Sequence, residues 1–246
     1  LTDAPDVRGA AAQAFAAAVA AFDPGRPIAV LGHFDADGLG AVAILVRASR
    51  ADGLAAEPVV VGKGETPWDD AVRDRLAALE PGGLIVADLG TRAEPVLAGC
   101  PTIIIDHHLP TGLLEGATVI SGNGLEPEPT SALLAWWATA GREELLWLAA
   151  LGLIGDMADE AGFPELAEAQ ARFGKTALKD ATSLVNAPRR TAAADAGPAL
   201  RLMLASDGPK AITKGDGEDA RALVAAKAEV RAAVEAARRV APRING

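Results

Sequence analysis

The sequence predicts an α/β fold, in which a parallel β-sheet lies sandwiched by helices and is followed by a mostly helical C-terminal part with a long terminal helix. Short apolar runs alternate with helical patterns through the first half of the chain, an order that is typical of parallel sheets. These runs are apolar throughout, as strands buried on both faces should be. After about residue 125 the strand signal disappears, which indicates that the second half is mostly helical.

Five strands and several helices are predicted in the first half. The strands are PIAVLG (27–32), PVVVG (58–62), GLIVADLG (83–90), PTIIIDHH (101–108) and ATVIS (117–121). An Ala-rich stretch at 10–22 precedes the first strand and is interpreted as a helix, and further helices are predicted near 38–51, 68–80 and 92–98. Helical crossovers of this kind connect neighbouring parallel strands.

Consecutive helices are predicted in the second half. They begin with PTSALLAWWATA (129–140) and EELLWLAALGLIGDMAD (143–159), whereas 186–199 is interpreted as a loop or a weak helix. The segment 216–240 reads as one long amphipathic helix, started by Asp216 and Gly217 and stopped by Pro242.

Composition narrows the classes of function. The chain has 246 residues and a formal net charge of −10, so a sequence-independent electrostatic grip on long nucleic acid is not expected. A small anionic substrate would need a metal ion or a local basic pocket. The single cysteine, Cys100, allows no internal disulfide and suits a reducing cytoplasm. No apolar run approaches the roughly 18 residues that span a bilayer, so no membrane partner is expected.

Acids and imidazoles follow three of the predicted strands, and all three histidines of the chain are among them. They are His33, Asp35 and Asp37 after the first strand, Asp88 at the third, and Asp106, His107 and His108 at the fourth. Ligands of open parallel sheets gather outside the carboxyl ends of the strands, so these side chains can meet in one cleft. Singly, each could cap a helix or a turn. Together, buried carboxylates repel one another unless cations neutralise them, which predicts a metal site. Mixed Asp and His ligands without Cys favour manganese, with magnesium, iron and zinc as alternatives.

These residues resemble the motifs of the DHH phosphoesterase superfamily, and in particular its RecJ-like branch. The first motif is His33-Phe34-Asp35-Ala36-Asp37-Gly38, and the second is Asp88 in IVADLG. The third is the triplet Asp106-His107-His108, and the fourth is Asp156 in LGLIGDM. The four motifs occur in order, and the resemblance covers about residues 25–160.

The resemblance implies a centre of two Mn²⁺ ions, with Mg²⁺ as an alternative. It implies that His33, Asp35 and Asp88 hold one ion, and that Asp37, Asp88, His107 and Asp156 hold the other, with Asp88 bridging. It assigns His108 as a substrate contact or acid. Asp106 would orient a His ring or a bound water.

Other candidate residues have a plain structural alternative. Arg92 could reach a phosphate, although a surface Arg is the default interpretation. Thr130 and Ser131 stand at a predicted helix start, where backbone N–H groups favour an anion, although simple capping is the preferred interpretation. The pair Trp136-Trp137 is interpreted as core rather than as a base-stacking platform.

The resemblance also implies the domain organisation and the activity. It implies a DHH phosphoesterase domain over 1–215 and a linker helix over 216–246 that leads toward a second lobe, whose glycine-rich GGGH loop the sequence lacks. The implied activity is hydrolysis of single-stranded DNA or short RNA oligonucleotides to mononucleotides. The alternatives are a small-molecule phosphatase or phosphodiesterase acting on bis-phosphorylated nucleotides, pyrophosphate or cyclic dinucleotides, and a non-catalytic scaffold. The oligomeric state is left open.

Overall fold

A five-stranded parallel sheet forms the centre of the molecule. A computed structural model describes residues 6–240. The strands are β1 (Ile28–Gly32), β2 (Ala56–Val60), β3 (Gly83–Ala87), β4 (Thr102–Asp106) and β5 (Thr118–Ser121), in the spatial order β2-β1-β3-β4-β5. Gly32 pairs with Ala87, and Ala87 pairs with Ile105, so β1, β3 and β4 end at the same level. The five predicted strands and their parallel arrangement are confirmed.

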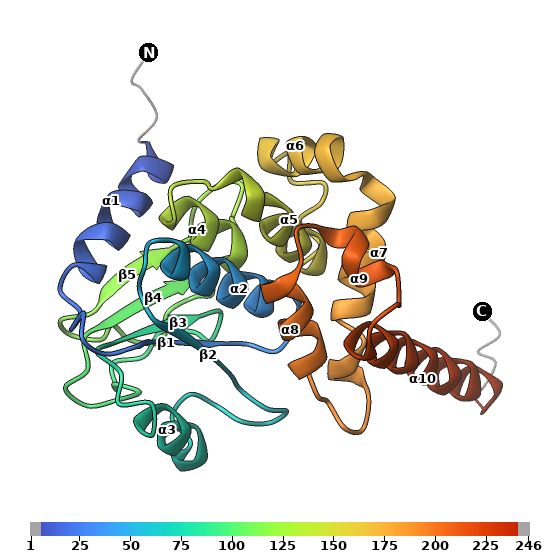
Figure 1. The fold of residues 1–246 in the computed structure, drawn as a ribbon, viewed down its shortest axis with the longest axis horizontal. Helices are drawn as coiled ribbons and strands as arrows, with labels where there is room; N and C mark the ends of the chain where they lie inside the picture. The colour runs from blue at the N-terminus through green and yellow to red at the C-terminus, as the bar shows by residue number, and fades with distance from the viewer. Residues whose placement is uncertain (1–5, 241–246) are drawn as a thin grey trace, which may run out of the picture.

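Ten helices surround or extend this sheet within the described residues (Figure 1). They are α1 (Val7–Val19), α2 (Ala36–Ala51), α3 (Asp70–Ala77), α4 (Ser131–Ala138), α5 (Leu146–Gly155), α6 (Pro164–Phe173), α7 (Lys175–Val185), α8 (Gly197–Ala205), α9 (Pro209–Thr213) and α10 (Glu218–Val240), with 3₁₀ turns η1 (Glu143–Leu145) and η2 (Pro188–Arg190). Helices α1, α2 and α4 contact one side of the sheet. Helix α3 covers the other side, and α5 to α10 extend the molecule beyond the sheet (Figure 1).

Alternate residues of β1 and β3 enter two separate cores. Val30, Ile85 and Ile103 pack in the large core with α2 and α4, whereas Leu31 and Leu84 pack with Val72 and Leu76 of α3. Both sets are fully buried. This burial on both faces explains why the strands read as continuous apolar runs.

One predicted helix, at 92–98, is wrong. This segment between β3 and β4 is irregular. Pro95 lies in its middle and cannot donate the backbone hydrogen bond that a helix interior requires. The Arg73 guanidinium instead donates to the carbonyl oxygens of Pro95 and Val96, at 3.2 and 3.1 Å, so those oxygens are satisfied without a helix.

The C-terminal half is helical, as predicted. Helix α10 packs against α7, α8 and η2, and it buries Ala220 and Leu223 near its start. The predicted stop at Pro242, like residues 1–5, lies outside the described residues.

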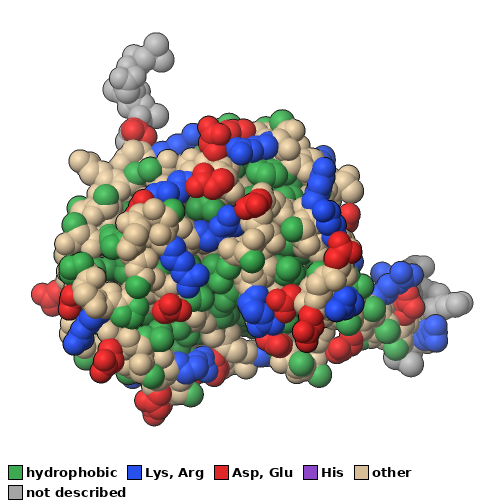
Figure 2. Space-filling model, viewed as in Figure 1, with side chains coloured by type: hydrophobic (Ala, Val, Ile, Leu, Met, Phe, Trp, Pro, Cys, Tyr) green, Lys and Arg blue, Asp and Glu red, His purple; other side chains and the backbone are tan. Residues whose placement is uncertain are grey.

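Within the described residues, no helix combines the length and the apolar character that crossing a bilayer requires. Acidic and basic side chains are mixed over the face drawn in Figure 2.

Candidate metal centre

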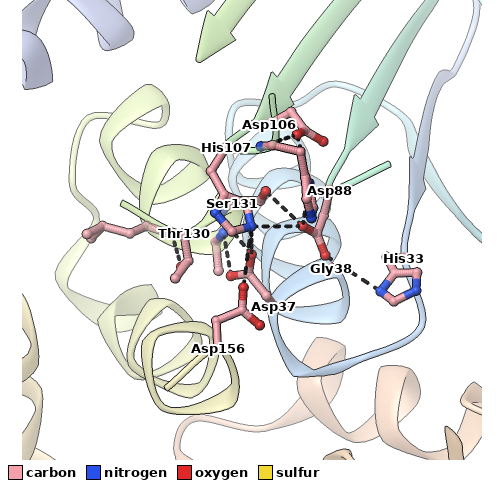
Figure 3. Close-up of polar contacts among 12 residues, drawn as sticks. His33, Asp37, Gly38, Asp88, Asp106, His107, Thr130, Ser131 and Asp156 are labelled. Atoms are coloured by element: carbon pink, nitrogen blue, oxygen red, sulfur yellow. Dashed lines mark hydrogen bonds and ion pairs between the residues drawn. The ribbon is translucent and has the colours of Figure 1, made fainter. Parts of the chain in front are cut away.

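The acidic and imidazole side chains that follow the strands converge at the carboxyl edge of the sheet (Figure 3). His33 follows β1, Asp88 follows β3, and His107 follows β4. Asp35 is the N-cap of α2, and its carboxylate accepts a 3.1 Å hydrogen bond from the Gly38 N–H. The remaining members are Asp37 in the first turn of α2, Asp106 at the end of β4, His108, and Asp156 at the C-terminal end of α5.

A first group of three donors lies around His33. Its Nδ1 is 3.1 Å from Asp35 Oδ2 and 3.7 Å from Asp88 Oδ2. One donor atom from each of these three residues lies within 4.8 Å of the others, which is close enough to hold a metal ion. Burial disfavours ionisation of Asp35, but the hydrogen bond and charge of His33 and the Gly38 N–H outweigh it and lower the pKa of Asp35 to about 2.

A second group lies around His107. Its Nε2 is 3.3 Å from Asp156 Oδ2, 3.6 Å from Asp88 Oδ1 and 3.9 Å from Asp37 Oδ2. This nitrogen is buried, and among the described residues it has no hydrogen-bond partner. Buried polar atoms normally have one. A buried imidazole nitrogen without a partner, faced by three carboxylates, fits a divalent cation of the kind that Asp and His ligands bind.

The pKa values of the second group also indicate that its carboxylates would be stabilised by a nearby positive charge. Burial raises the pKa of Asp37 well above its usual range, and the charges of Asp88 and Asp156 raise it further. Burial also raises the pKa of Asp88. Burial alone would lower the pKa of His107, but the carboxylates of Asp156 and Asp88 outweigh it and raise this pKa to about 11. A metal ion that binds here would displace these protons, because a cation stabilises the ionised carboxylates.

Helix α4 holds two of the carboxylates in place. The backbone N–H groups of Ser131 and Ala132 donate to Asp37 Oδ2 and Oδ1 at 2.8 and 2.9 Å, and the Ser131 hydroxyl donates to Asp88 Oδ1 at 3.0 Å. The Thr130 hydroxyl caps α4 by accepting from the Leu133 N–H at 3.4 Å. Thr130 and Ser131 are both buried. Their placement therefore favours capping and carboxylate positioning over the predicted substrate contact.

Asp106 orients the ring of His108. Asp106 Oδ1 accepts from the His108 backbone N–H at 2.7 Å and lies 2.9 Å from His108 Nδ1. Its other oxygen accepts from the Gly90 N–H at 2.7 Å. The hydrogen bond that the His108 ring donates to the Asp106 carboxylate raises the pKa of His108. More than half of the His108 side chain is exposed, at 55%, so the part of the ring that Asp106 does not hold is accessible.

Three further residues at the site were not predicted from the sequence. Arg189 Nη1 lies 2.8 Å from Asp35 Oδ2, Asn186 Oδ1 accepts from the Ala36 N–H at 2.9 Å, and Glu128 Oε1 lies 3.3 Å from His107 Nδ1. Asn186 and Arg189 belong to the segment predicted as a loop or weak helix, about 150 residues from their partners in the chain. No local pattern marks such a contact.

The predicted candidate Arg92 lies outside the cluster of acids. It is exposed, and its guanidinium carbon lies 4.2 Å from the centre of the Trp68 ring. Both residues line a pocket of about 400 Å³ that also reaches His33, Asp88 and His108. Trp136 and Trp137 pack in the core, as predicted.

Comparison with known proteins identifies the family. The model of the DHH family, N-terminal domain, matches residues 27–153, which is more than half of the chain. The chain therefore belongs to the DHH family. Among curated proteins, none matches it.

Solved structures share its fold. Exonuclease RecJ bound to manganese has a TM-score of 0.65 at 24% identity, over 94% of this chain and 66% of that one. RecJ from Thermus thermophilus in complex with Mn²⁺ gives 0.62 at 24% identity, over 96% and 39%. The DHH domain of a member of a family of ribosomal proteins gives 0.65 at 17% identity, over 95% and 63%. The chain thus has the RecJ-like DHH fold and spans between 39% and 66% of the length of these proteins.

Proposed function

We propose that this chain is a phosphodiesterase dependent on two divalent metal ions, and that it hydrolyses single-stranded DNA or short RNA oligonucleotides to mononucleotides. The observation that carries the proposal is that His33 and Asp35 lie on one side of Asp88 and the His107 group on the other, and that the buried His107 Nε2 has no hydrogen-bond partner among the described residues. Membership of the DHH family and the RecJ-like fold support it.

The ligand assignment follows the two donor groups. His33, Asp35 and Asp88 would hold one ion, and Asp37, Asp88, His107 and Asp156 the other. The two oxygens of Asp88 support a bridging role, because Oδ2 faces His33 at 3.7 Å and Oδ1 faces His107 at 3.6 Å. Mn²⁺ is the favoured ion, and Mg²⁺ is the alternative. Two such ions would supply Lewis-acid stabilisation of a phosphoryl oxygen and lower the pKa of an attacking water.

The residues of the chain supply orientation and a proton. Because its Nδ1 is engaged by Asp106, His108 is fixed with the rest of its ring accessible from the pocket. Its raised pKa favours the imidazolium form, which can donate a hydrogen bond to a phosphate and a proton to a leaving oxygen. The Ser131 hydroxyl holds the Asp88 carboxylate, and backbone N–H groups of α4 hold the Asp37 carboxylate, so both are oriented toward the candidate metal centre.

The acidic chain favours short substrates over long duplexes, since no net positive charge attracts a polyanion. We propose Arg92 as a phosphate contact. Thr130 and Ser131 stay predictions as substrate residues, and their buried hydrogen bonds argue for a positioning role instead. We expect a reducing cytoplasm as the compartment, because the single cysteine, Cys100, cannot form an internal disulfide.

A second candidate function is hydrolysis of a small phosphoester such as a bis-phosphorylated nucleotide, pyrophosphate or a cyclic dinucleotide. The pocket of about 400 Å³ beside the donor groups favours it, because that volume is typical of a site for one small ligand.

Hydrolysis assays separate these candidates. The protein is incubated with Mn²⁺ and 5′-labelled single-stranded DNA, a short RNA, or a bis-phosphorylated nucleotide, and the products are resolved by length. We expect stepwise release of mononucleotides by the wild-type chain and none by Asp88→Asn. Asp159→Asn is the matched control, because Asp159 pairs with Lys179 instead of a donor group. Phosphate release with intact oligonucleotides would favour the second candidate, and no turnover with metal bound would overturn both.

A further inference from the structure

The pocket beside the metal centre has a second wall that the proposed chemistry does not use. One side of the pocket is formed by residues of the two donor groups, and the other by Pro67, Trp68, Leu89 and Arg92. The second wall therefore offers an apolar surface and one cation to a small ligand bound beside the metal centre.

Hydrogen bonds fix this wall in its position. The Trp68 indole Nε1–H donates to the Glu94 carbonyl oxygen at 2.9 Å, and the Thr66 hydroxyl donates to Asp69 Oδ1 at 2.9 Å. Glu65, the one acid of the pocket outside the donor groups, is engaged by both terminal nitrogens of Arg75, at 3.0 and 2.6 Å. The negative charge of Glu65 is thus balanced, and an anion in the pocket meets little opposition from it.

Arg92 is the cation of this wall that is available to an anion. Its guanidinium stacks on Trp68 at 4.2 Å from the ring centre, and no carboxylate of the described residues lies within 4.0 Å of it. Stacking on an aromatic ring restricts the guanidinium without using its N–H groups. Those groups form a planar fork that matches a phosphate. In a chain with a net charge of −10, an unpaired Arg at the edge of an acidic cluster suits an anionic ligand.

We propose that this pocket is a subsite for one nucleotide of the substrate, in which Arg92 binds a phosphate and the wall of Pro67, Trp68 and Leu89 contacts the base. Trp68 is also a positioning residue, because it holds the guanidinium of Arg92. The proposal rests on the proposed function, since it takes the metal centre as the place of hydrolysis. The volume of about 400 Å³ lies in the range of sites for one small ligand, which a single nucleotide is.

Binding of three probes tests the subsite without any turnover. AMP, adenosine and ribose 5-phosphate are titrated calorimetrically into the full chain with Mg²⁺ present. We expect AMP to bind most tightly, and Arg92→Gln to weaken AMP by roughly tenfold, as loss of a charged hydrogen bond should, while adenosine is unchanged. Trp68→Leu should weaken AMP and adenosine by roughly fivefold or more, and Trp68→Phe should retain most of the affinity.

Arg26→Gln is the matched control, because Arg26 is also an exposed Arg but precedes β1 at the opposite edge of the sheet. It should leave AMP binding unchanged. Wild-type protein that does not bind AMP, or an AMP affinity that Arg92→Gln and Trp68→Leu leave unaltered, would overturn the subsite.

Kinetics separate failure of the subsite from failure of the proposed function. Bis(p-nitrophenyl) phosphate reports on the metal centre, and a dinucleotide reports on the centre and the subsite together. We expect Arg92→Gln to raise KM for the dinucleotide by a larger factor than it lowers kcat/KM for bis(p-nitrophenyl) phosphate, which carries no nucleotide. An equal loss on both substrates would overturn the subsite and leave the phosphodiesterase proposal intact. No hydrolysis of either substrate by the wild type would overturn the proposed function, and AMP binding would then decide the subsite alone.

Discussion

Asp88 joins the two donor groups because of where the backbone places it. It follows the last residue of β3, and its backbone has a φ of +61°, in the left-handed region that Asp tolerates better than most residues. Its own N–H still donates to the Ile105 carbonyl oxygen at 3.1 Å, as if the strand continued. The carboxylate is thereby held between His33 and His107, with one oxygen toward each.

Two substitutions distinguish a ligand from a substrate contact. Asp88→Asn should abolish binding of both ions, because one carboxylate serves each group, and should lower activity by more than about 100-fold. His108→Gln should keep both ions while lowering kcat by about 100-fold or more, because it removes a proton donor. Metal content after dialysis, measured by elemental analysis, checks both variants against Asp159→Asn. Two ions retained by Asp88→Asn would contradict the bridging assignment, and an ion lost by His108→Gln would make that residue a ligand.

At the residue scale, the candidate metal ligands are predictable from the sequence, whereas the residues that contact and orient them are not. His33, Asp88 and His107 are predictable because each follows a strand whose end lies at the same edge of a parallel sheet. Arg189 and Glu128 are not, because their contacts depend on how distant segments pack and leave no periodic or motif signal.

Helices α2, α4 and α5 approach closely behind the second donor group. Gly152 of α5 faces the N-terminal ends of α2 and α4, and a Cβ at this position would lie 2.3 Å from Asp37 Oδ1 and 2.6 Å from the Ala132 Cβ. This contact requires glycine, because no side chain fits between α5 and the carboxylate. The same packing that builds the core thus fixes Asp37.

Gly152→Ala should therefore disturb stability and metal binding together. We expect a loss of about 1–3 kcal/mol in the free energy of unfolding from overpacking, and a Tm lower by roughly 2–10 °C. Metal affinity should fall as well, since Asp37 must move. Thermal unfolding and metal titration check this, with Gly217→Ala as the control because a Cβ there meets nothing within 4 Å. A Gly152→Ala protein with unchanged Tm and affinity would show that the contact is not tight in solution.

At the element scale, the strands are predictable and one crossover is not. The run III within PTIIIDHH is continuous and apolar because β4 is buried on both faces. The segment 92–98 lies where a helical crossover is expected, but it is irregular. Pro95 interrupts the helical hydrogen bonds, and the Arg73 guanidinium donates to the carbonyl oxygens of Pro95 and Val96. Arg73 lies in α3, so the irregular conformation of 92–98 depends partly on a residue outside that segment.

The whole molecule concentrates negative charge at one edge of the sheet. The chain carries a net charge of −10, and Asp37, Asp88 and Asp106 are among its buried acids. Folding without a cation must bring these groups together against their repulsion and their loss of hydration. A divalent ion bound only to the folded state removes that cost, so metal binding and global stability should be linked.

Mn²⁺ should accordingly raise the Tm of the whole chain. At a concentration about 100 times the Kd, one site adds about 2.7 kcal/mol to the free energy of unfolding. For a chain of this size, that corresponds to a Tm higher by roughly 5–10 °C. Thermal unfolding with Mn²⁺, compared with a chelator, measures the shift. KCl at the same ionic strength is the control for general screening of the net charge, and it should give a much smaller shift. Asp88→Asn should lose most of the Mn²⁺ effect. If KCl matched Mn²⁺, or if Asp88→Asn kept the full shift, the stabilisation would come from overall charge screening and not from the buried donor groups.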